Sequence, residues 1–250
     1  MINLDELKAR VYHGLKTNSL SAENWEYVIC QAMGAEWIPG DTYLADGVLD
    51  NYVLNIKTLK QAPTILKTKE NRDFLSDPER FNPTQAVMDQ RRTGISSARL
   101  DEHTCDPVEI GVATFESFEQ TAQRSFDKFP GTDTVLDVVV RYGEDRNQEN
   151  FLVDIDIFEH TFYDARKLEW REVFGGSRSQ HAGERVAVEG FNDGQLVARR
   201  VCGHVRFKAT MYQIVKDLTK SERNYTTSVP LPDRLPFDRD EILAEIARFK

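Results

Sequence analysis

The stretch Asp46-Gly-Val-Leu-Asp-Asn-Tyr-Val-Leu-Asn-Ile-Lys57 has the pattern of a tight β-hairpin. Its two apolar runs are separated by Asp50-Asn51, a pair that tolerates the positive φ of a two-residue turn. In that register Asp46 lies opposite Asn55, and opposed residues share one face of a hairpin. Lys57 points to the same face, because side chains alternate along a strand. A carboxylate, an amide oxygen and an ammonium group therefore converge, as at a site for a metal ion and a phosphate, although any half-exposed hairpin also alternates polar and apolar residues.

A helix is predicted just upstream of the hairpin, from Ser21 to Met33. Ser21 is a suitable N-cap and Gly34 a natural stop. Apolar residues at 25, 28, 29, 32 and 33 have the spacing of one buried helical stripe. Glu26 lies at the edge of that stripe, about 100° from Trp25, whereas Glu23 points nearly opposite. We therefore expect Glu26, and not Glu23, to reach a site between the helix and the sheet.

Three features together resemble the PD-(D/E)xK nuclease superfamily, and within it the type II restriction endonucleases. They are a helical glutamate after an aromatic residue, an aspartate that opens a hairpin, and the Asn55-Ile-Lys57 motif on its second strand. Ala45 precedes Asp46 where the family usually has Pro, and Asn55 stands where it usually has Asp or Glu, as in some type II restriction endonucleases. The resemblance covers about residues 21–60. It implies an α/β fold, with a restriction-endonuclease-like mixed β-sheet flanked by α-helices, added loops and a β ribbon.

Hydrolysis of a phosphodiester needs charge stabilisation on the phosphate, an activated water and in-line geometry. Mg²⁺ prefers oxygen ligands and keeps several waters. The resemblance implies a catalytic set of Asp46, Asn55, Lys57 and Glu26 with a Mg²⁺ ion. Asp46 would be the main metal ligand and Asn55 the second, while Lys57 would orient water or stabilise the phosphorane. Glu26 would act through a metal-bound water or a second metal ion; the alternative is a solvent-exposed residue at the edge of its helix.

A second group of acidic residues is an alternative metal site. Asp154 and Asp156 alternate with apolar residues and share one face of a predicted strand, and Asp137 is expected near them on the neighbouring strand. No lysine follows at the required spacing. The five histidines are dispersed, and no phosphate-binding Gly-rich loop is present. The hairpin is therefore the preferred site.

At 250 residues the chain could form one large domain or two small ones, and our interpretation is a single nuclease domain over residues 1–250, with a catalytic core at about 20–160. The 250 residues are enough to bury a proper core. No stretch approaches 18 apolar residues, and the N-terminus lacks a basic segment followed by an apolar run. Three scattered cysteines without CxxC spacing suggest reduced thiols. We therefore expect a cytoplasmic protein, and the resemblance to restriction endonucleases implies a bacterial or archaeal source.

Charge is distributed unevenly along this chain, whose net charge is −9. Residues 57–99 hold nine Lys and Arg against five Asp and Glu, and residues 164–223 hold twelve against eight. Residues 100–150 hold four against twelve and are expected to face away from DNA. Because local charge governs contacts with phosphates, we expect DNA-recognition elements at about 61–106 and 164–225.

Residues 175–183 form a donor-rich loop similar to recognition loops in some restriction endonucleases. Arg178 is suited to bidentate contacts with guanine and Gln180 to contacts with adenine. An ordinary surface loop is the alternative interpretation. The candidate DNA-binding residues are Arg178, Ser179, Gln180 and His181 in this loop, with Arg91 and Arg92 elsewhere in the chain.

Periodicity and turn signals predict the remaining elements. Helices are expected over 5–15, 115–129, 163–174 and 240–249, and strands over 134–142, 151–158, 186–189, 195–201 and 204–211. The polar, proline-broken region 61–106 is interpreted as loop with short helical pieces.

The function predicted from these observations is site-specific cleavage of double-stranded DNA with Mg²⁺, as by a type II restriction enzyme. Cutting both strands with one site per chain would suit a homodimer, although a monomer is an alternative. Two other functions remain open. One is a structure-specific DNA repair or resolvase nuclease; the other is a non-catalytic DNA-binding protein on the same scaffold, for which Asn55 would mark lost metal chemistry.

Overall fold

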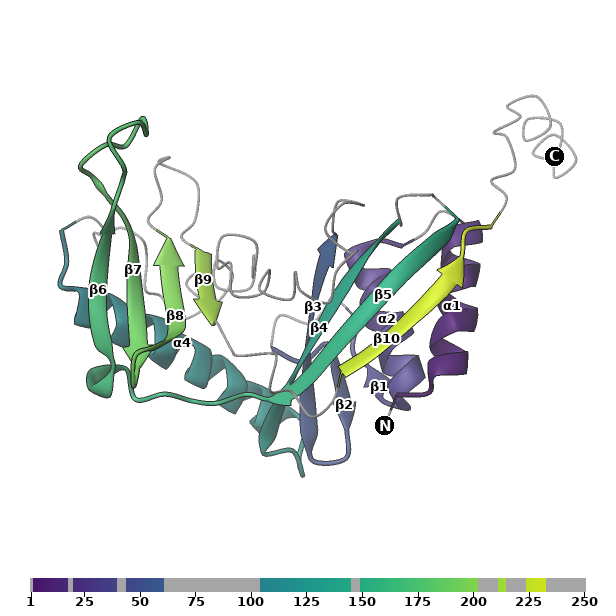
Figure 1. Cartoon of the computed structure of the whole chain (residues 1–250). Coiled ribbons are helices and arrows are strands. Elements are labelled where there is room, and N and C mark those ends of the chain that lie inside the picture. Colours follow the sequence, from purple (N-terminus) through teal and green to yellow (C-terminus); the bar gives the residue numbers. More distant parts are fainter. Residues whose placement is uncertain are drawn as a thin grey trace, which may run out of the picture.

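The computed structural model describes residues 2–17, 20–39, 44–60, 104–144, 149–201, 211–214 and 224–232. They form a mixed α/β structure with two sheets, as the sequence predicts at the level of fold class (Figure 1). The helical elements are α1 (Leu4–Lys16), α2 (Ala22–Met33), α4 (Pro107–Lys128) and the short 3₁₀ helix η2 (Ala165–Lys167). The strands are β1 (Glu36–Trp37), β2 (Gly47–Leu49), β3 (Tyr52–Lys60), β4 (Thr134–Glu144), β5 (Asn150–Glu159), β6 (Glu169–Phe174), β7 (Arg185–Asn192), β8 (Gln195–Val201), β9 (Met211–Ile214) and β10 (Asn224–Pro230).

The larger sheet has the order β1-β2-β3-β4-β5-β10. Its strands pair antiparallel except for β3 and β4, which are parallel. Parallel neighbours need a crossover connection, and the chain between β3 and β4 contains α4. The smaller sheet, β6-β7-β8-β9, is antiparallel throughout.

The predicted hairpin is present in the predicted register. Gly47 pairs with Leu54, Val48 with Val53 and Leu49 with Tyr52. Asp50 has a φ of 52°, the left-handed conformation that the turn requires. The turn is also tied to the start of β4, because the Asn51 amide donates to Asp133 Oδ1 at 3.0 Å. The hairpin thereby joins the rest of the sheet at both its edge and its tip.

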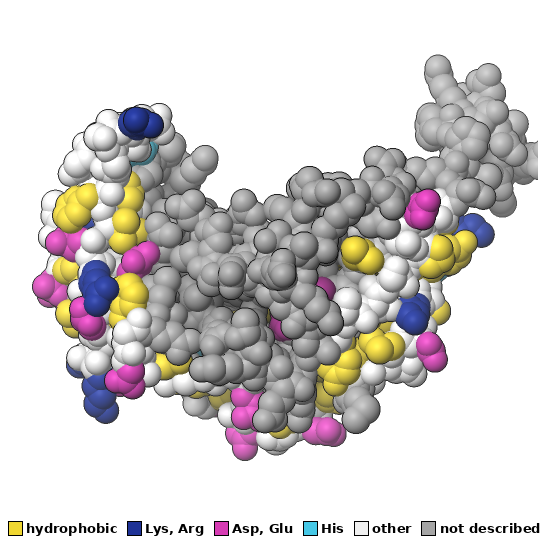
Figure 2. All heavy atoms as spheres, in the orientation of Figure 1, with side chains coloured by type: hydrophobic (Ala, Val, Ile, Leu, Met, Phe, Trp, Pro, Cys, Tyr) yellow, Lys and Arg dark blue, Asp and Glu magenta, His cyan; other side chains and the backbone are white. Residues whose placement is uncertain are grey.

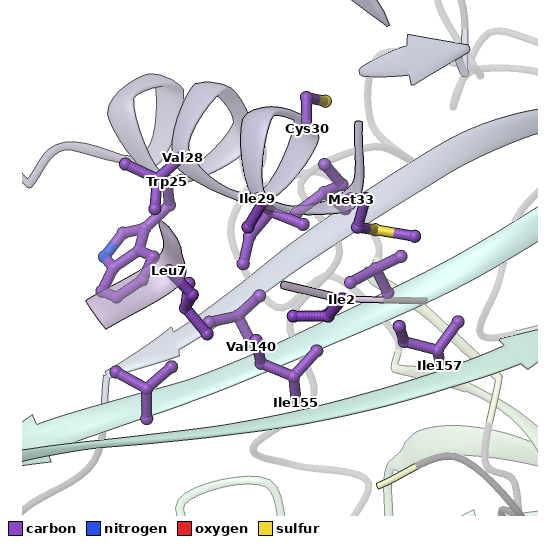
Figure 3. Packing of buried hydrophobic residues seen from close by; sticks show 14 of the residues in the cluster. Ile2, Leu7, Trp25, Val28, Ile29, Cys30, Met33, Val140, Ile155 and Ile157 are labelled. Carbon is purple, nitrogen blue, oxygen red and sulfur yellow. The ribbon is translucent and has the colours of Figure 1, made fainter. Parts of the chain in front are cut away.

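Helices α1 and α2 pack on one face of the larger sheet. Ser21 caps α2 by accepting from the Asn24 N–H, and Gly34 ends it with a φ of 75°, as predicted. Trp25, which is fully buried, stacks near Tyr142 and Phe151. Figure 3 shows the apolar side chains of α2 directed onto those of β4 and β5. This packing fixes the orientation of α2 and so the direction in which its edge residues point.

Helix α4 covers the opposite face, because Leu136 belongs to the core beneath α2 while its neighbour Val135 packs with Phe115 and Phe118 of α4. α4 also packs against β6 and β7 of the smaller sheet (Figure 1). Trp170 of β6 contacts Phe115 edge-on, with its ring centroid 6.3 Å away, and its indole N–H donates to the Ala165 carbonyl. One helix therefore contacts both sheets.

The close approach of Trp170 to Gly111 on α4 makes a testable contact. A Cβ at Gly111 would lie 2.0 Å from the Trp170 ring, so Gly111→Val must displace either the indole or the helix. We expect a loss of about 1–3 kcal/mol in the free energy of unfolding, measured by urea denaturation with tryptophan fluorescence. Gly176→Ala is the control, because a Cβ there meets no atom within 4 Å. Equal stability of the two variants would contradict this packing.

Two of the predicted elements differ from the structure. The helix predicted over 163–174 is instead η2 followed by strand β6, which pairs with β7. The apolar residues of this strand, Trp170, Val173 and Phe174, happen to have the i, i+3, i+4 spacing of a helix, but the pairing with β7 makes the segment a strand. The helix predicted over 115–129 begins earlier, since Asp106 is its N-cap and Pro107 occupies the first turn, where proline is well tolerated.

Several predictions lie partly or wholly outside the described residues: Arg91, Arg92, nearly all of 61–106, most of the strand at 204–211, and the helix at 240–249. Within the described part, strands β1 and β10 were not expected from the sequence, and 211–214 forms β9. None of the described helices has the length and apolar character needed to span a membrane.

Candidate functional site

Asp46 lies where strands β2 and β3 separate. The pairing of the two strands begins at Gly47 and Leu54, and just beyond it the Asp46 N–H donates to the Leu54 carbonyl at 2.9 Å. The Asp46 carboxylate then accepts from the backbone N–H of Ile56 at 2.6 Å, a position that a neighbouring strand would otherwise occupy. The carboxylate is thereby fixed at the edge of β3.

Lys57 folds back toward this carboxylate. Its Nζ lies 3.7 Å from Asp46 Oδ2 and donates to the Ile56 carbonyl at 3.2 Å. The side chains of Lys57 and Asp46 are only 20% and 18% exposed, so their attraction is screened less than that of a surface pair. The predicted pairing of Asp46 with Lys57 is therefore present, and it lies at the edge of the sheet.

Glu26 approaches the same two residues from α2. Burial first, and then the negative charge of Asp46, raise the pKa of Glu26 to about 7, while the charge of Lys57 acts in the opposite direction. A carboxylate whose negative charge raises the pKa of a second carboxyl group marks a place where a cation would be stabilised. Glu26, Asp46 and Lys57 thus form one charged cluster, which we call the edge cluster.

Cys30 lies against the backbone of this cluster. Its thiol approaches the Asp46 carbonyl at 3.6 Å, and a Cβ at Gly47 would lie 2.5 Å from its sulfur. Burial, together with the charges of Asp46 and Glu26, raises the pKa of the Cys30 thiol to about 12, so the side chain stays neutral. Cys30 is a packing residue that holds the start of β2 against α2.

Asn55 has a different neighbour from the one that the hairpin pattern predicts. The parallel register places it beside Asp137 of β4, and its amide nitrogen donates to Asp137 Oδ1 at 2.7 Å. The second carboxylate oxygen lies 2.8 Å from His160 Nδ1. All three residues are buried, and the Asn55 amide oxygen has no hydrogen-bond partner among the described residues. Asn55, Asp137 and His160 form a second group, the buried polar chain.

The oxygen atoms of these two groups suit a hard cation such as Mg²⁺. Asp46 and Glu26 supply two carboxylates whose repulsion a cation would relieve, and the Asn55 amide oxygen is buried without a partner among the residues described. In the part of the chain that the structure describes, no three acidic, histidine or cysteine side chains gather as a complete metal site. The residues therefore fit an ion that takes two carboxylates and completes its shell with other oxygens.

The alternative acidic pair is neutralised within the protein. Asp154 and Asp156 do share a face, as predicted, and both carboxylates contact Arg141 Nη2, at 2.5 and 2.7 Å. Asp154 also accepts from the Thr226 hydroxyl. Asp137 belongs to the buried polar chain instead. Because a guanidinium already lies between the two carboxylates, this pair resembles a structural ion pair more than a metal site.

The loop with the predicted recognition residues connects β6 and β7 and extends beyond the ends of these strands, at the upper left of Figure 1. Arg178, Ser179 and Gln180 are exposed, while His181 is half-buried and contacts Glu184 at 3.0 Å. The structure therefore separates these residues from the edge cluster and places them on a different sheet.

The basic excess of residues 164–223 is partly neutralised by local pairs. Arg171 pairs with Glu169, Lys167 with Asp164, and Arg166 with Glu116 of α4. Figure 2 shows basic and acidic side chains interspersed over the described surface on this face. The described charges on that face therefore do not by themselves mark one binding surface.

Sequence reasoning missed the buried polar chain. The local pattern relates Asp137 only to Asp154 and Asp156, and it leaves His160 as one of five dispersed histidines. One signal was present: Asp137 is a single charge within the apolar run Val135-Leu-Asp-Val-Val-Val140, and a buried charge requires a partner. The partner itself depends on the parallel register of β3 and β4, which no local pattern predicts.

Replacing Glu26 by Gln is expected to change the pH dependence of stability. A raised carboxyl pKa means that the folded state keeps a proton that the unfolded state has lost, so wild-type stability falls as pH rises from about 4.5 to about 7. Glu26→Gln removes this fall and should be more stable than wild type by about 1–2 kcal/mol at pH 8, with no gain at pH 4.

Urea denaturation at the two pH values measures this difference. The control is Glu109→Gln at an exposed position of α4, which should follow the wild type at both pH values. The same gain for Glu26→Gln at pH 4 and pH 8 would contradict a raised pKa.

The four residues predicted to be catalytic are thus divided between two groups, each of which includes one residue of β3. Asp46, Lys57 and Glu26 form the edge cluster, and Asn55 belongs to the buried polar chain. Comparison of the chain with protein-family models, curated proteins and solved structures finds no match in any of the three. Function is therefore inferred from the residues and their geometry.

Proposed function

We propose that the protein is a Mg²⁺-dependent deoxyribonuclease that cleaves double-stranded DNA at specific sites, in the manner of a type II restriction endonuclease. The observation that carries the proposal is the edge cluster, in which two carboxylates and a lysine lie together with the Lys57 ammonium 3.7 Å from Asp46 Oδ2. Such a set combines cation binding with stabilisation of a charged phosphate. Cation binding alone, or a lysine beside a carboxylate alone, would not distinguish the edge cluster from a surface ion pair.

The arrangement of secondary structure supports the same proposal. The helix with Glu26 packs on one face of a mixed sheet, and α4 packs on the other. The hairpin with Asp46 and Lys57 belongs to that sheet and leads, through the crossover, to the parallel strand β4. This is the kind of helix-flanked mixed sheet that the nuclease resemblance implies.

In the proposed mechanism, Asp46 and Glu26 would hold the Mg²⁺ ion, and the Asn55 amide oxygen would be a third ligand. When bound, the ion would lower the pKa of a coordinated water and offset charge on the phosphate. Lys57, held beside the site by Asp46 and the Ile56 carbonyl, donates to the attacking water or to a phosphate oxygen. Its charge is a fixed donor where negative charge develops, which is how such groups lower a barrier.

The substrate is tested by incubating the protein with unmethylated phage DNA, a plasmid and a branched DNA junction in Mg²⁺. We expect discrete fragments from the phage DNA and none with EDTA. Cleavage confined to the junction would indicate a structure-specific repair or resolvase nuclease instead. Binding of DNA without cleavage under any of these conditions would indicate a non-catalytic DNA-binding protein and would contradict the proposal.

A further inference from the structure

We propose that Asp137, held by His160, is a positioning residue that orients the Asn55 amide so that its oxygen is presented to the cation. The inference rests on the proposed function in one respect, since it takes Asn55 as an oxygen ligand. It adds two residues, Asp137 and His160, that the nuclease resemblance does not include. The juxtaposition that supports it is the buried polar chain across β3 and β4.

The orientation of the Asn55 amide follows from the chemistry of its neighbour. An amide presents either its nitrogen or its oxygen to a given partner, and a carboxylate only accepts hydrogen bonds. With Asp137 Oδ1 at 2.7 Å, the group facing it must be the NH₂ of Asn55. The amide oxygen is consequently directed elsewhere. A serine, threonine or amide at position 137 would accept either face of Asn55, and so would not determine which atom is presented.

His160 fixes the carboxylate in turn. Its Nδ1 lies 2.8 Å from Asp137 Oδ2 and must carry the hydrogen, because the carboxylate supplies only lone pairs. The imidazole stacks on Phe118 of α4, with centroids 4.3 Å apart, and meets Phe162 edge-on at 4.8 Å. Only 1% of the His160 side chain is exposed. The ring therefore has little freedom to move, and Asp137 is held from both sides.

The Asn55 end of the buried polar chain points to a missing partner. Asn55 is 6% exposed, and its amide oxygen has no hydrogen-bond partner among the described residues. Burying such an oxygen unpaired is unfavourable, so its retention calls for a ligand. Asn55 lies on the same face of β3 as Lys57, two residues away, and next to the Ile56 N–H that anchors the Asp46 carboxylate. We assign a cation held by the edge cluster as this partner.

This arrangement also accounts for Asn, in place of an acid, at position 55. An aspartate there would place a second carboxylate against Asp137, and like charges at hydrogen-bonding distance repel strongly. With Asp137 beside it, an amide presents an oxygen to the site without that repulsion. The negative charge that the nuclease family usually has at position 55 is instead on Asp137 of the neighbouring strand β4.

The test measures Mn²⁺ binding in the absence of DNA. The electron paramagnetic resonance signal of the free ion reports how much Mn²⁺ remains unbound. Asp137→Asn should weaken Mn²⁺ binding by about 10–100-fold, the usual effect of losing a residue that orients a ligand. The exchanged pair Asn55→Asp with Asp137→Asn restores a donor and an acceptor in reversed roles, and should recover at least wild-type affinity. Asp133→Asn is the matched control, because Asp133 accepts from the Asn51 amide at 3.0 Å in an exposed pair.

The outcomes separate the inference from the proposed function. Weaker Mn²⁺ binding by Asp137→Asn, with recovery in the exchanged pair, supports the inference. This holds even if the wild type cuts no DNA, because the absence of cleavage would contradict only the nuclease proposal. Wild-type affinity in Asp137→Asn, with only a lower melting temperature, would show a merely structural role and overturn it. Absence of Mn²⁺ binding by the wild type, or failure of the exchanged pair to recover affinity although it folds, would also overturn it.

Discussion

Lys57→Ala is expected to lower the rate of DNA cleavage by about 10²–10³-fold while leaving Mg²⁺ binding nearly unchanged. The reason is the division of roles in the edge cluster. The ammonium group lies beside Asp46 as a donor, and the oxygen atoms of Asp46 and Glu26 are the groups suited to the ion. Single-turnover cleavage measures the first effect, and the shift of melting temperature on adding Mg²⁺ measures the second.

Lys8→Ala is the matched control, since Lys8 is an exposed lysine on α1, remote in sequence from the hairpin. It should leave both the cleavage rate and the metal-induced shift unchanged. If Lys57→Ala retained full cleavage activity, the edge cluster would not be the catalytic centre, and Lys57 would not be the donor to water or phosphate.

Arg141→Met should reduce the free energy of unfolding by about 3–5 kcal/mol, because it leaves the buried carboxylate of Asp156 and the partly buried carboxylate of Asp154 without their shared cation. The side chains of Arg141 and Asp156 are 6% and 1% exposed, so water cannot readily replace the guanidinium. Replacing Asp154 and Asp156 by Leu in the same variant should restore most of the stability, since the charges are then removed together. Urea denaturation measures all three proteins.

The control for this change is Arg124→Met at an exposed position of α4, which should alter stability by less than about 0.5 kcal/mol. A small effect of Arg141→Met, together with tighter binding of Mg²⁺, would contradict a structural role for the pair. It would instead indicate that Asp154 and Asp156 form a cation site that Arg141 occupies in competition.

The parts of the structure that sequence predicts well are those determined locally. The hairpin register follows from a two-residue turn at Asp50 and Asn51 between apolar runs, and the bounds of α2 follow from Ser21 and Gly34. Glu26 lies near Asp46 because helical periodicity places it at the edge of the buried stripe. In each case residues within a few positions of one another carry the information.

The parts that sequence did not predict depend on distant pairing. The register of β3 beside β4 decides that Asn55 meets Asp137, and these two residues are separated by a long crossover. Strand β6 has apolar residues at the spacing of a helix, and only its pairing with β7 makes it a strand. A local sequence pattern does not indicate which strands distant in the sequence will pair. The buried polar chain therefore appears only in the folded protein.

The most direct test of the nuclease proposal compares wild type with Asp46→Ala on supercoiled plasmid in Mg²⁺. Asp46 would both bind the metal ion and hold Lys57 in place, so its loss should abolish cleavage and the Mg²⁺-induced rise in melting temperature together. Asp127→Ala, at an exposed position of α4, should behave as wild type. Cleavage that persists in Asp46→Ala, or a wild type that never cuts the plasmid, would contradict the nuclease proposal.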